Sequence, residues 1–116
     1  MNVQKTMIVA AIDEDRAVIY FAPSVIREQA DVDKVAEEIQ EIVRDYPFRI
    51  MVLNFARVKT LSSSFLGKIV KLNNELKARN RKLRVCELSE EVANCFKLLK
   101  LQKVIPVYKT EEKALK

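Results

Sequence analysis

Three consecutive serines, Ser62 to Ser64, are the residues whose type and spacing could support chemistry. They follow an apolar run, Ile50 to Phe55, and precede apolar residues at helical spacing, namely Phe65, Ile69, Leu72 and Leu76. A serine directly before such a segment can cap the helix, where unpaired backbone N–H groups and the positive end of the helix dipole gather. Two interpretations follow. One serine caps while the others solvate a loop, or a serine accepts a phosphoryl group, because this position favours added negative charge.

The rest of the chain predicts one domain, residues 1 to 116. This length is enough to bury about two-thirds of the extended surface without a metal or disulfide. Nearly half of the residues (49%) are apolar and only one is glycine, so neither a disordered segment nor a second domain is indicated.

Several classes of activity are disfavoured by composition. The chain has no histidine, which excludes the usual Cys/His zinc sites and histidine base catalysis, and no glycine-rich phosphate loop follows a strand. We therefore expect no enzymatic activity, no metal and no cofactor. An enzyme or ligand-binding module remains a third hypothesis, which a binding screen with nucleotides and anionic lipids would test.

The two cysteines, Cys86 and Cys95, read as small core residues and fit a reducing compartment. No apolar run approaches the roughly 20 residues of a membrane span, and the first residues are too short and mixed for a secretory signal. We expect a cytoplasmic protein without direct membrane insertion.

Charge is unevenly spread along the chain. Residues 1 to 56 carry 6 basic and 10 acidic side chains, whereas residues 57 to 116 carry 15 and 6. The lysines of the basic half follow helix exteriors without aromatic interleaving, which favours a solvated face or an acidic protein partner over nucleic acid.

In the first half, Met7 to Ile12 and Ala17 to Ala22 predict a hairpin, and Pro23 ends the second strand. Asp31 is the expected N-cap of an amphipathic helix from Asp31 to Asp45, with Glu38 on its polar face. Tyr46-Pro47 ends that helix.

In the second half, Leu83 to Leu88 predicts a strand, and Ser89 the cap of the next helix. A last strand from about Val104 to Tyr108 contains Pro106, which places it at a sheet edge, and Thr110 is the expected cap of a short helix through Lys116. The order ββαβαβαβα predicts an α/β fold with parallel strands and right-handed crossovers.

This pattern resembles the STAS domain, the module of anti-sigma factor antagonists and of the cytoplasmic ends of sulfate transporters. Ser62-Ser63-Ser64-Phe65-Leu66-Gly67 is similar to the family's Asp-Ser-Ser-Gly-Leu-Gly signature. The preceding strand, the later strand and helix from Leu83, and the closing strand and helix match at the level of pattern, so the resemblance covers nearly the whole chain. It implies a STAS-like (βα)n superhelix with a small mixed β-sheet and helices mostly on one side.

The resemblance also implies a mechanism. In bacterial partner switching, a STAS protein binds an anti-sigma factor that is also a serine kinase, and phosphorylation of the signature serine releases it. The acceptor position falls on Ser63, with Ser62 and Ser64 as the lesser choices. The implied partner surface comprises Ser62, Ser63, Ser64, Phe65, Lys68 and Lys71.

Two positions depart from the signature. Ser62 replaces the aspartate, and Phe65 replaces the first glycine with a bulky ring where a close approach was possible. These departures leave a second hypothesis open: a STAS accessory subunit of a membrane transporter or signalling complex that is not phosphorylated. The sequence gives no prediction of oligomeric state.

Overall fold

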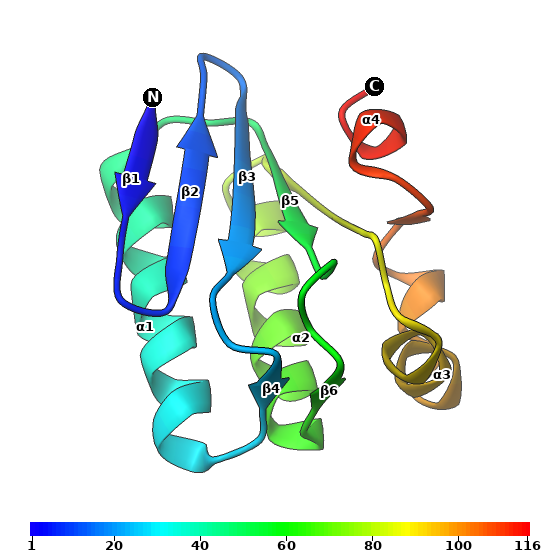
Figure 1. Cartoon of the computed structure of the whole chain (residues 1–116). Coiled ribbons are helices and arrows are strands. Elements are labelled where there is room, and N and C mark those ends of the chain that lie inside the picture. The colour runs from blue at the N-terminus through cyan, green and yellow to red at the C-terminus, as the bar shows by residue number, and fades with distance from the viewer.

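A computed structural model describes all 116 residues and contains a six-stranded mixed sheet with strand order β1-β2-β3-β5-β7-β8 (Figure 1). Its strands are β1 (Asn2–Gln4), β2 (Ile8–Ile12), β3 (Arg16–Phe21), β5 (Ile50–Asn54), β7 (Lys82–Cys86) and β8 (Val107–Tyr108). The first three strands are antiparallel neighbours, and β3, β5, β7 and β8 run parallel. The predicted hairpin and the parallel α/β arrangement are therefore confirmed.

Four α-helices accompany the sheet: α1 (Gln29–Asp45), α2 (Ser63–Ala78), α3 (Glu90–Leu98) and α4 (Glu111–Ala114). The long helices α1 and α2 lie side by side against one face of the sheet (Figure 1). They shield the main core, to which β3 contributes Ala17, Ile19 and Phe21 at alternate positions. None of the helices is long and apolar enough to cross a membrane.

Aromatic rings connect the sheet with helices α2 and α3 at the carboxyl end of the parallel strands. Phe21 stacks on Phe55 with ring centroids 5.1 Å apart, and Phe65 meets Phe21 edge-on at 5.9 Å. Phe96 of α3 meets Phe55 at 6.2 Å. This chain of contacts joins β3, the end of β5, α2 and α3, so the start of α2 is tied directly to the core.

Part of the second face of the sheet is covered by the short helix α4. Val18, Val52 and Cys86 pack there against Ala114. The Tyr20 hydroxyl and the Asn54 amide both donate to Glu111 Oε1, at 2.6 and 2.9 Å. The helices are thus mostly on one side, as predicted, with α4 on the other.

We predict that the free energy of unfolding falls above about pH 9, because the Cys86 thiol is buried on this second face. Burial raises the pKa of the Cys86 thiol to about 12 from 9.0, so the folded state excludes the thiolate. A group whose pKa is raised on folding stabilises the protein below its unfolded pKa and loses that contribution as the pH rises to its folded pKa. The free energy of unfolding should therefore fall by about 1.4 kcal/mol for each pH unit above 9.

Urea unfolding between pH 8 and 11 measures this slope, with Cys86→Ala as the matched control. Tyr20, whose pKa is also raised by burial and by Glu111, titrates only from about pH 10 in the unfolded chain. The control should therefore keep its stability for about one pH unit longer. An identical onset in both proteins would contradict a buried neutral thiol.

Several sequence expectations about element boundaries are wrong. Helix α1 begins at Gln29, so Asp31 lies in its first turn, and the residue at the N-cap, Glu28, makes no side-chain cap bond. The backbone itself holds this turn, since the Val32 N–H donates to the Glu28 carbonyl at 2.9 Å. Strand β1 was not predicted, because it has only three residues with mostly exposed side chains.

The expected strand from Val104 begins only at Val107. A 3₁₀ turn, η1 (Leu101–Lys103), precedes it, after Lys100 has turned the chain in a left-handed conformation with φ 55°. Leu101 and Ile105 are buried there, so their apolar character reflects burial in a turn and not in a strand. The edge position of β8 and the caps by Ser89 and Thr110 are as predicted.

Candidate functional site at the start of helix α2

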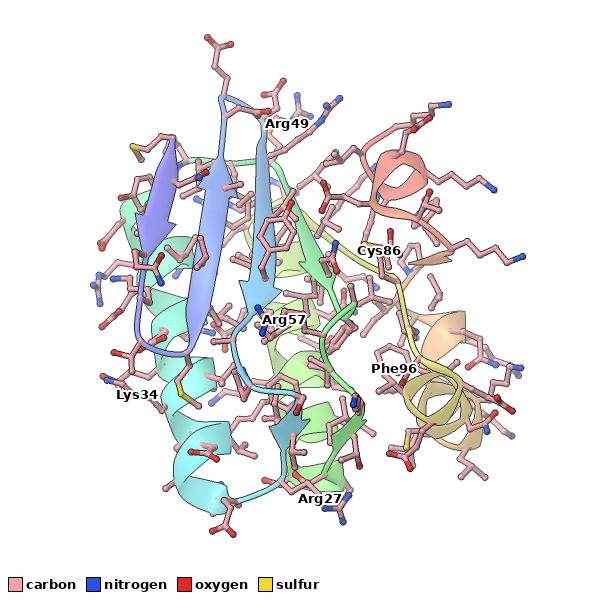
Figure 2. All side chains as sticks on the ribbon, viewed as in Figure 1. Arg27, Lys34, Arg49, Arg57, Cys86 and Phe96 are labelled. Atoms are coloured by element: carbon pink, nitrogen blue, oxygen red, sulfur yellow. The ribbon has the colours of Figure 1, made fainter.

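The loop that carries the three serines is fixed by a second, two-stranded parallel sheet. β4 (Val25–Ile26) pairs with β6 (Thr60–Leu61), and the Ser62 N–H then donates to the Ile26 carbonyl at 3.0 Å. Arg27, beside these strands in Figure 2, donates to Thr60 Oγ1 at 3.2 Å and to the Leu61 carbonyl at 3.1 Å. The backbone leading into α2 is therefore held on the side of β4 as well as by the core.

The three serines have different environments. Ser62 is the N-cap, and its hydroxyl oxygen accepts a hydrogen bond from the Phe65 N–H at 3.2 Å. Ser64 is exposed and donates to Gln29 Oε1 at 3.1 Å. The Ser63 side chain is exposed and takes part in none of the side-chain hydrogen bonds of the protein. Of the three hydroxyls, the one on Ser63 is thus both exposed and free.

The first turn of α2 contains no acidic residue. By contrast, α3 begins with Glu90 and Glu91, and α4 with Glu111 and Glu112. An acid at this position is stabilised by the helix dipole and by the unpaired N–H groups. The start of α2 consequently has a favourable place for negative charge that its own side chains leave unfilled.

The expectation that Phe65 belongs to the partner surface is wrong. Its side chain is 1% exposed and packs against Phe21 in the core. The ring therefore neither contacts a partner in this conformation nor obstructs one. Gly67, the glycine that remains in the signature stretch, is exposed, and a Cβ added there would meet nothing within 4 Å.

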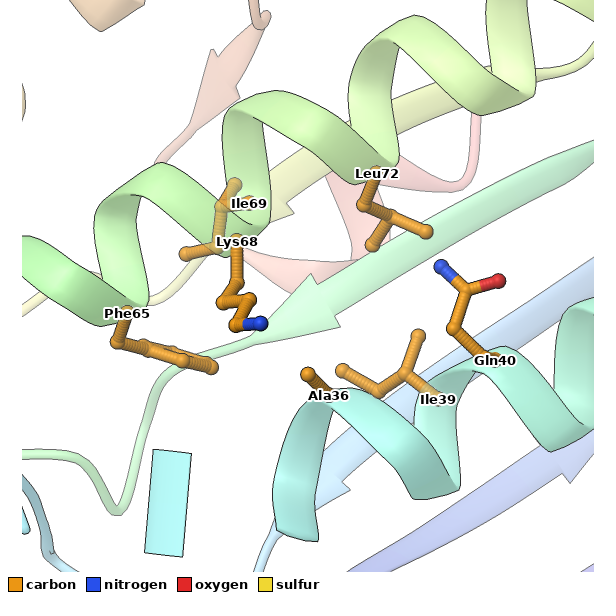
Figure 3. A pocket seen from close by; sticks show the side chains of 7 residues that line it. All are labelled: Ala36, Ile39, Gln40, Phe65, Lys68, Ile69 and Leu72. Carbon is orange, nitrogen blue, oxygen red and sulfur yellow. The ribbon is translucent and has the colours of Figure 1, made fainter. Parts of the chain in front are cut away.

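The two lysines lie on the outer side of α2, beside α1. Lys68 Nζ is 3.8 Å from Asp33 Oδ1, and Lys71 is exposed. Both line an open polar groove of ≈ 630 Å³ between the helices, with acidic and basic side chains on its walls. Figure 3 shows the apolar crevice beneath it, where Ile39 of α1 faces Phe65, Ile69 and Leu72 of α2. The serine loop and this groove form one continuous edge of the molecule.

We predict that Ser62→Ala and Ser63→Ala differ in stability. The first removes the hydroxyl that caps α2 and should lower the free energy of unfolding by about 1 kcal/mol. The second removes an exposed hydroxyl without a partner and should change it by less than about 0.5 kcal/mol. Parallel urea titrations measure both, and a larger loss for Ser63→Ala than for Ser62→Ala would show that the capping hydroxyl has been assigned to the wrong serine.

The STAS domain family model matches residues 14–114 of the chain. The chain belongs to the STAS domain family. The fold agrees with an anti-sigma factor antagonist from Mycobacterium paratuberculosis, with a TM-score of 0.81 at 19% identity over 93% of this chain and 89% of that one. Phosphorylated SpoIIAA of Bacillus gives 0.70 at 18% identity, over 93% and 96% of the two chains.

The fold is also similar to that of a sulfate transporter family protein from Wolinella succinogenes. It matches with a TM-score of 0.66 at 13% identity, over 87% of this chain and 80% of that one. At these identities the neighbours establish the fold, and the geometry of the serine loop has to be judged from this chain's own residues.

Three features of the site were not found from the sequence. Arg27 and Gln29 belong to a stretch, 24 to 30, that reads as irregular, and their contacts with the serine loop span more than 30 residues. The β4–β6 pairing was also missed, because each strand has only two residues. Pro23 and the polar residues between positions 24 and 30 predict a bend in the chain, but they do not predict which distant residues the bend contacts.

Proposed function

We propose that this STAS domain is a protein-binding regulator of the anti-sigma factor antagonist type, switched by phosphorylation of Ser63. Its partner is an anti-sigma factor that is also a serine kinase. The observation that carries the proposal is the exposed, unbonded Ser63 hydroxyl at the first position of α2. The contact surface comprises Ser62, Ser63, Ser64, Lys68 and Lys71.

The chemistry of the switch follows from charge. The Ser63 hydroxyl oxygen would attack the γ-phosphorus of ATP held by the kinase, with ADP leaving and the hydroxyl proton passing to a base of the kinase. The phosphoryl group brings about −1.5 to −2 charges to a helix start that accommodates them. The same charge disrupts a partner surface that fits a neutral hydroxyl, so the partner is released.

The two departures from the family signature are compatible with this function. Ser62 supplies the cap that an aspartate would supply in the same place. The Phe65 ring points into the core, so no bulky side chain projects beside Ser63 at this position. Gly67 is exposed and leaves further room on the same helix. A partner backbone can therefore approach the loop closely.

We predict a single phosphate on Ser63 after incubation with ATP and the cognate serine kinase. Mass spectrometry of proteolytic fragments locates it, and Ser63→Ala is the matched control, because the cap on Ser62 is left intact. The intact mass of the control should stay unchanged. Phosphate on Ser64 or elsewhere, with none on Ser63, would refute this assignment.

A second function is favoured by the likeness to the sulfate transporter family protein and by the loss of the signature aspartate. In that case the domain is a constitutive subunit of a membrane transporter or signalling complex, and its edge at α2 binds without phosphorylation. Affinity purification from the native cells separates the two. Recovery of a transporter subunit in place of a kinase would support this function over the first.

A further inference from the structure

A second groove, of ≈ 390 Å³, lies at the opposite end of α2 from the serine loop. It is bounded by the last turns of α2, the beginning of β7, and the segment from η1 to β8. Its walls include four cationic side chains, Lys77, Arg81, Lys82 and Arg84, and no carboxylate. The 16 residues of α2 span about 24 Å, so this groove is well separated from Ser63.

The cations of this groove have no acidic partner in the protein. Of the 15 basic residues from Arg57 to Lys116, only Lys68 forms a salt bridge. The position of Lys77 in the last turn of α2 is explained by the helix dipole. That reason does not extend to Arg84, which lies within β7.

Both arginines are held in place with most of their donors free. Arg84 gives one hydrogen bond, to the Ala114 carbonyl at 2.8 Å, and lies 5.6 Å from the ring centroid of Tyr108. Arg81 gives one, to the Val43 carbonyl at 3.0 Å, and lies 4.6 Å from the ring centroid of Phe48. A guanidinium has five N–H donors, so each keeps several unused. The Tyr108 ring beside Arg84 also lines the groove, so the Arg84 guanidinium is held at its wall.

Asn73 is an independent sign of a ligand site. Its side chain is 4% exposed, lines the groove, and takes part in none of the side-chain hydrogen bonds. No fully buried side-chain polar atom in the protein lacks a partner, so the Asn73 amide keeps a small exposure, and Asn73 is one of the residues that line the groove. A buried amide without a protein partner costs free energy unless water or a ligand bonds to it.

The backbone adds one more donor. The Lys82 N–H donates toward β5, to the Arg49 carbonyl, and the Val85 N–H donates toward β8, to the Pro106 carbonyl. Because directions alternate along a strand, the Leu83 N–H points to the β8 side, where β8 pairs only with Val85 and Cys86. The groove is therefore rich in donors and poor in acceptors.

We propose that this groove binds a small molecule bearing at least two oxyanion groups, phosphate or carboxylate. Arg81 and Arg84 bind the oxyanions, Asn73 and the Leu83 N–H bond to them from the floor, and Lys77 and Lys82 close the rim. The volume suits a small molecule. The neighbouring edge strand has only two residues, follows Pro106 and precedes Lys109, which disfavours addition of a peptide strand.

Titration of the ¹⁵N-labelled protein with pyrophosphate, citrate and inorganic phosphate tests this site by NMR. We expect saturable shifts confined to the Asn73 amide, the Leu83 N–H and the arginine N–H groups, with pyrophosphate or citrate binding at least about tenfold tighter than phosphate. A preference for pyrophosphate or for citrate tells whether the oxyanion groups of the natural ligand are phosphates or carboxylates. Shifts spread over the whole basic half would refute a defined site.

Three variants and one matched control complete the experiment. Arg84→Gln, Asn73→Leu and Lys82→Gln should each weaken binding, the first by about tenfold. Lys97→Gln removes the same charge from exposed α3, outside the groove, and should leave affinity unchanged. Lys82 is exposed, so its variant remains informative if another fails to fold. Equal weakening by Lys97→Gln would overturn the proposal, whereas the Ser63 assignment is unaffected by either result.

Discussion

Phe65→Ala should lower the free energy of unfolding by about 3–5 kcal/mol, a large part of the 5–15 kcal/mol typical of a domain. The ring is 1% exposed and meets Phe21 edge-on, so its removal leaves a cavity and one aromatic contact fewer. The cavity lies under the first turn of α2, where the surroundings are held by β4–β6 and cannot easily collapse. Urea unfolding at neutral pH measures the loss.

Phe65→Leu is the matched control for this prediction. It keeps most of the buried volume and should cost less than about 1.5 kcal/mol. A loss below about 1 kcal/mol for Phe65→Ala would mean that the ring is on the surface, as the signature alignment implied. In that case Phe65 would again be a candidate partner contact.

Phe65 shows which features of a helix a sequence pattern can determine. Helical spacing grouped Phe65 with Ile69, Leu72 and Leu76, and all four are buried. The resemblance placed the same residue on a partner surface, because it occupies a position where the family signature has glycine. The periodicity gave the better answer, since it reports which side of a helix meets the core.

Long apolar runs and helix starts were the most predictable features. The central strand, the hairpin and the caps on Ser89 and Thr110 follow from local signals, because their partners lie within a few residues or along an obvious face. Local signals also predicted that one serine would cap α2, but three identical neighbours gave no means of choosing Ser62. Ser62 is the cap because β6 ends at Leu61, directly before it.

Contacts between distant residues could not be predicted. Glu38 was expected on the polar face of α1, yet it is 3% exposed and accepts hydrogen bonds from the backbone N–H groups of Thr6 and Met7 at 3.2 and 2.7 Å. These bonds satisfy the buried carboxylate and fix the β1–β2 turn to α1. A glutamate among lysines and other glutamates carries no local mark of such a role, because the backbone N–H groups that it accepts from are more than 30 residues away.

Ser63→Asp should weaken binding of the anti-sigma factor partner by at least about a hundredfold, because a charge is forced into a contact that has to lose water. The fold should be unaffected. Aspartate in the first turn of α2, which has no acid of its own, is favourable by about 0.3–1 kcal/mol, so the melting temperature should stay level or rise slightly. Calorimetric titration against the purified partner gives the affinity, and thermal unfolding gives the stability.

Ser63→Asn separates charge from shape in this experiment. It has nearly the size of aspartate but is neutral, so it should lose much less affinity, by about tenfold or less, through imperfect fit alone. Strong loss with Asp and weak loss with Asn would mean that the loop responds to charge, as a phosphorylation switch requires. Equal affinities for Asp, Asn and Ala at this position would place the switch elsewhere, and Ser63 would then be only an exposed residue beside the cap on Ser62.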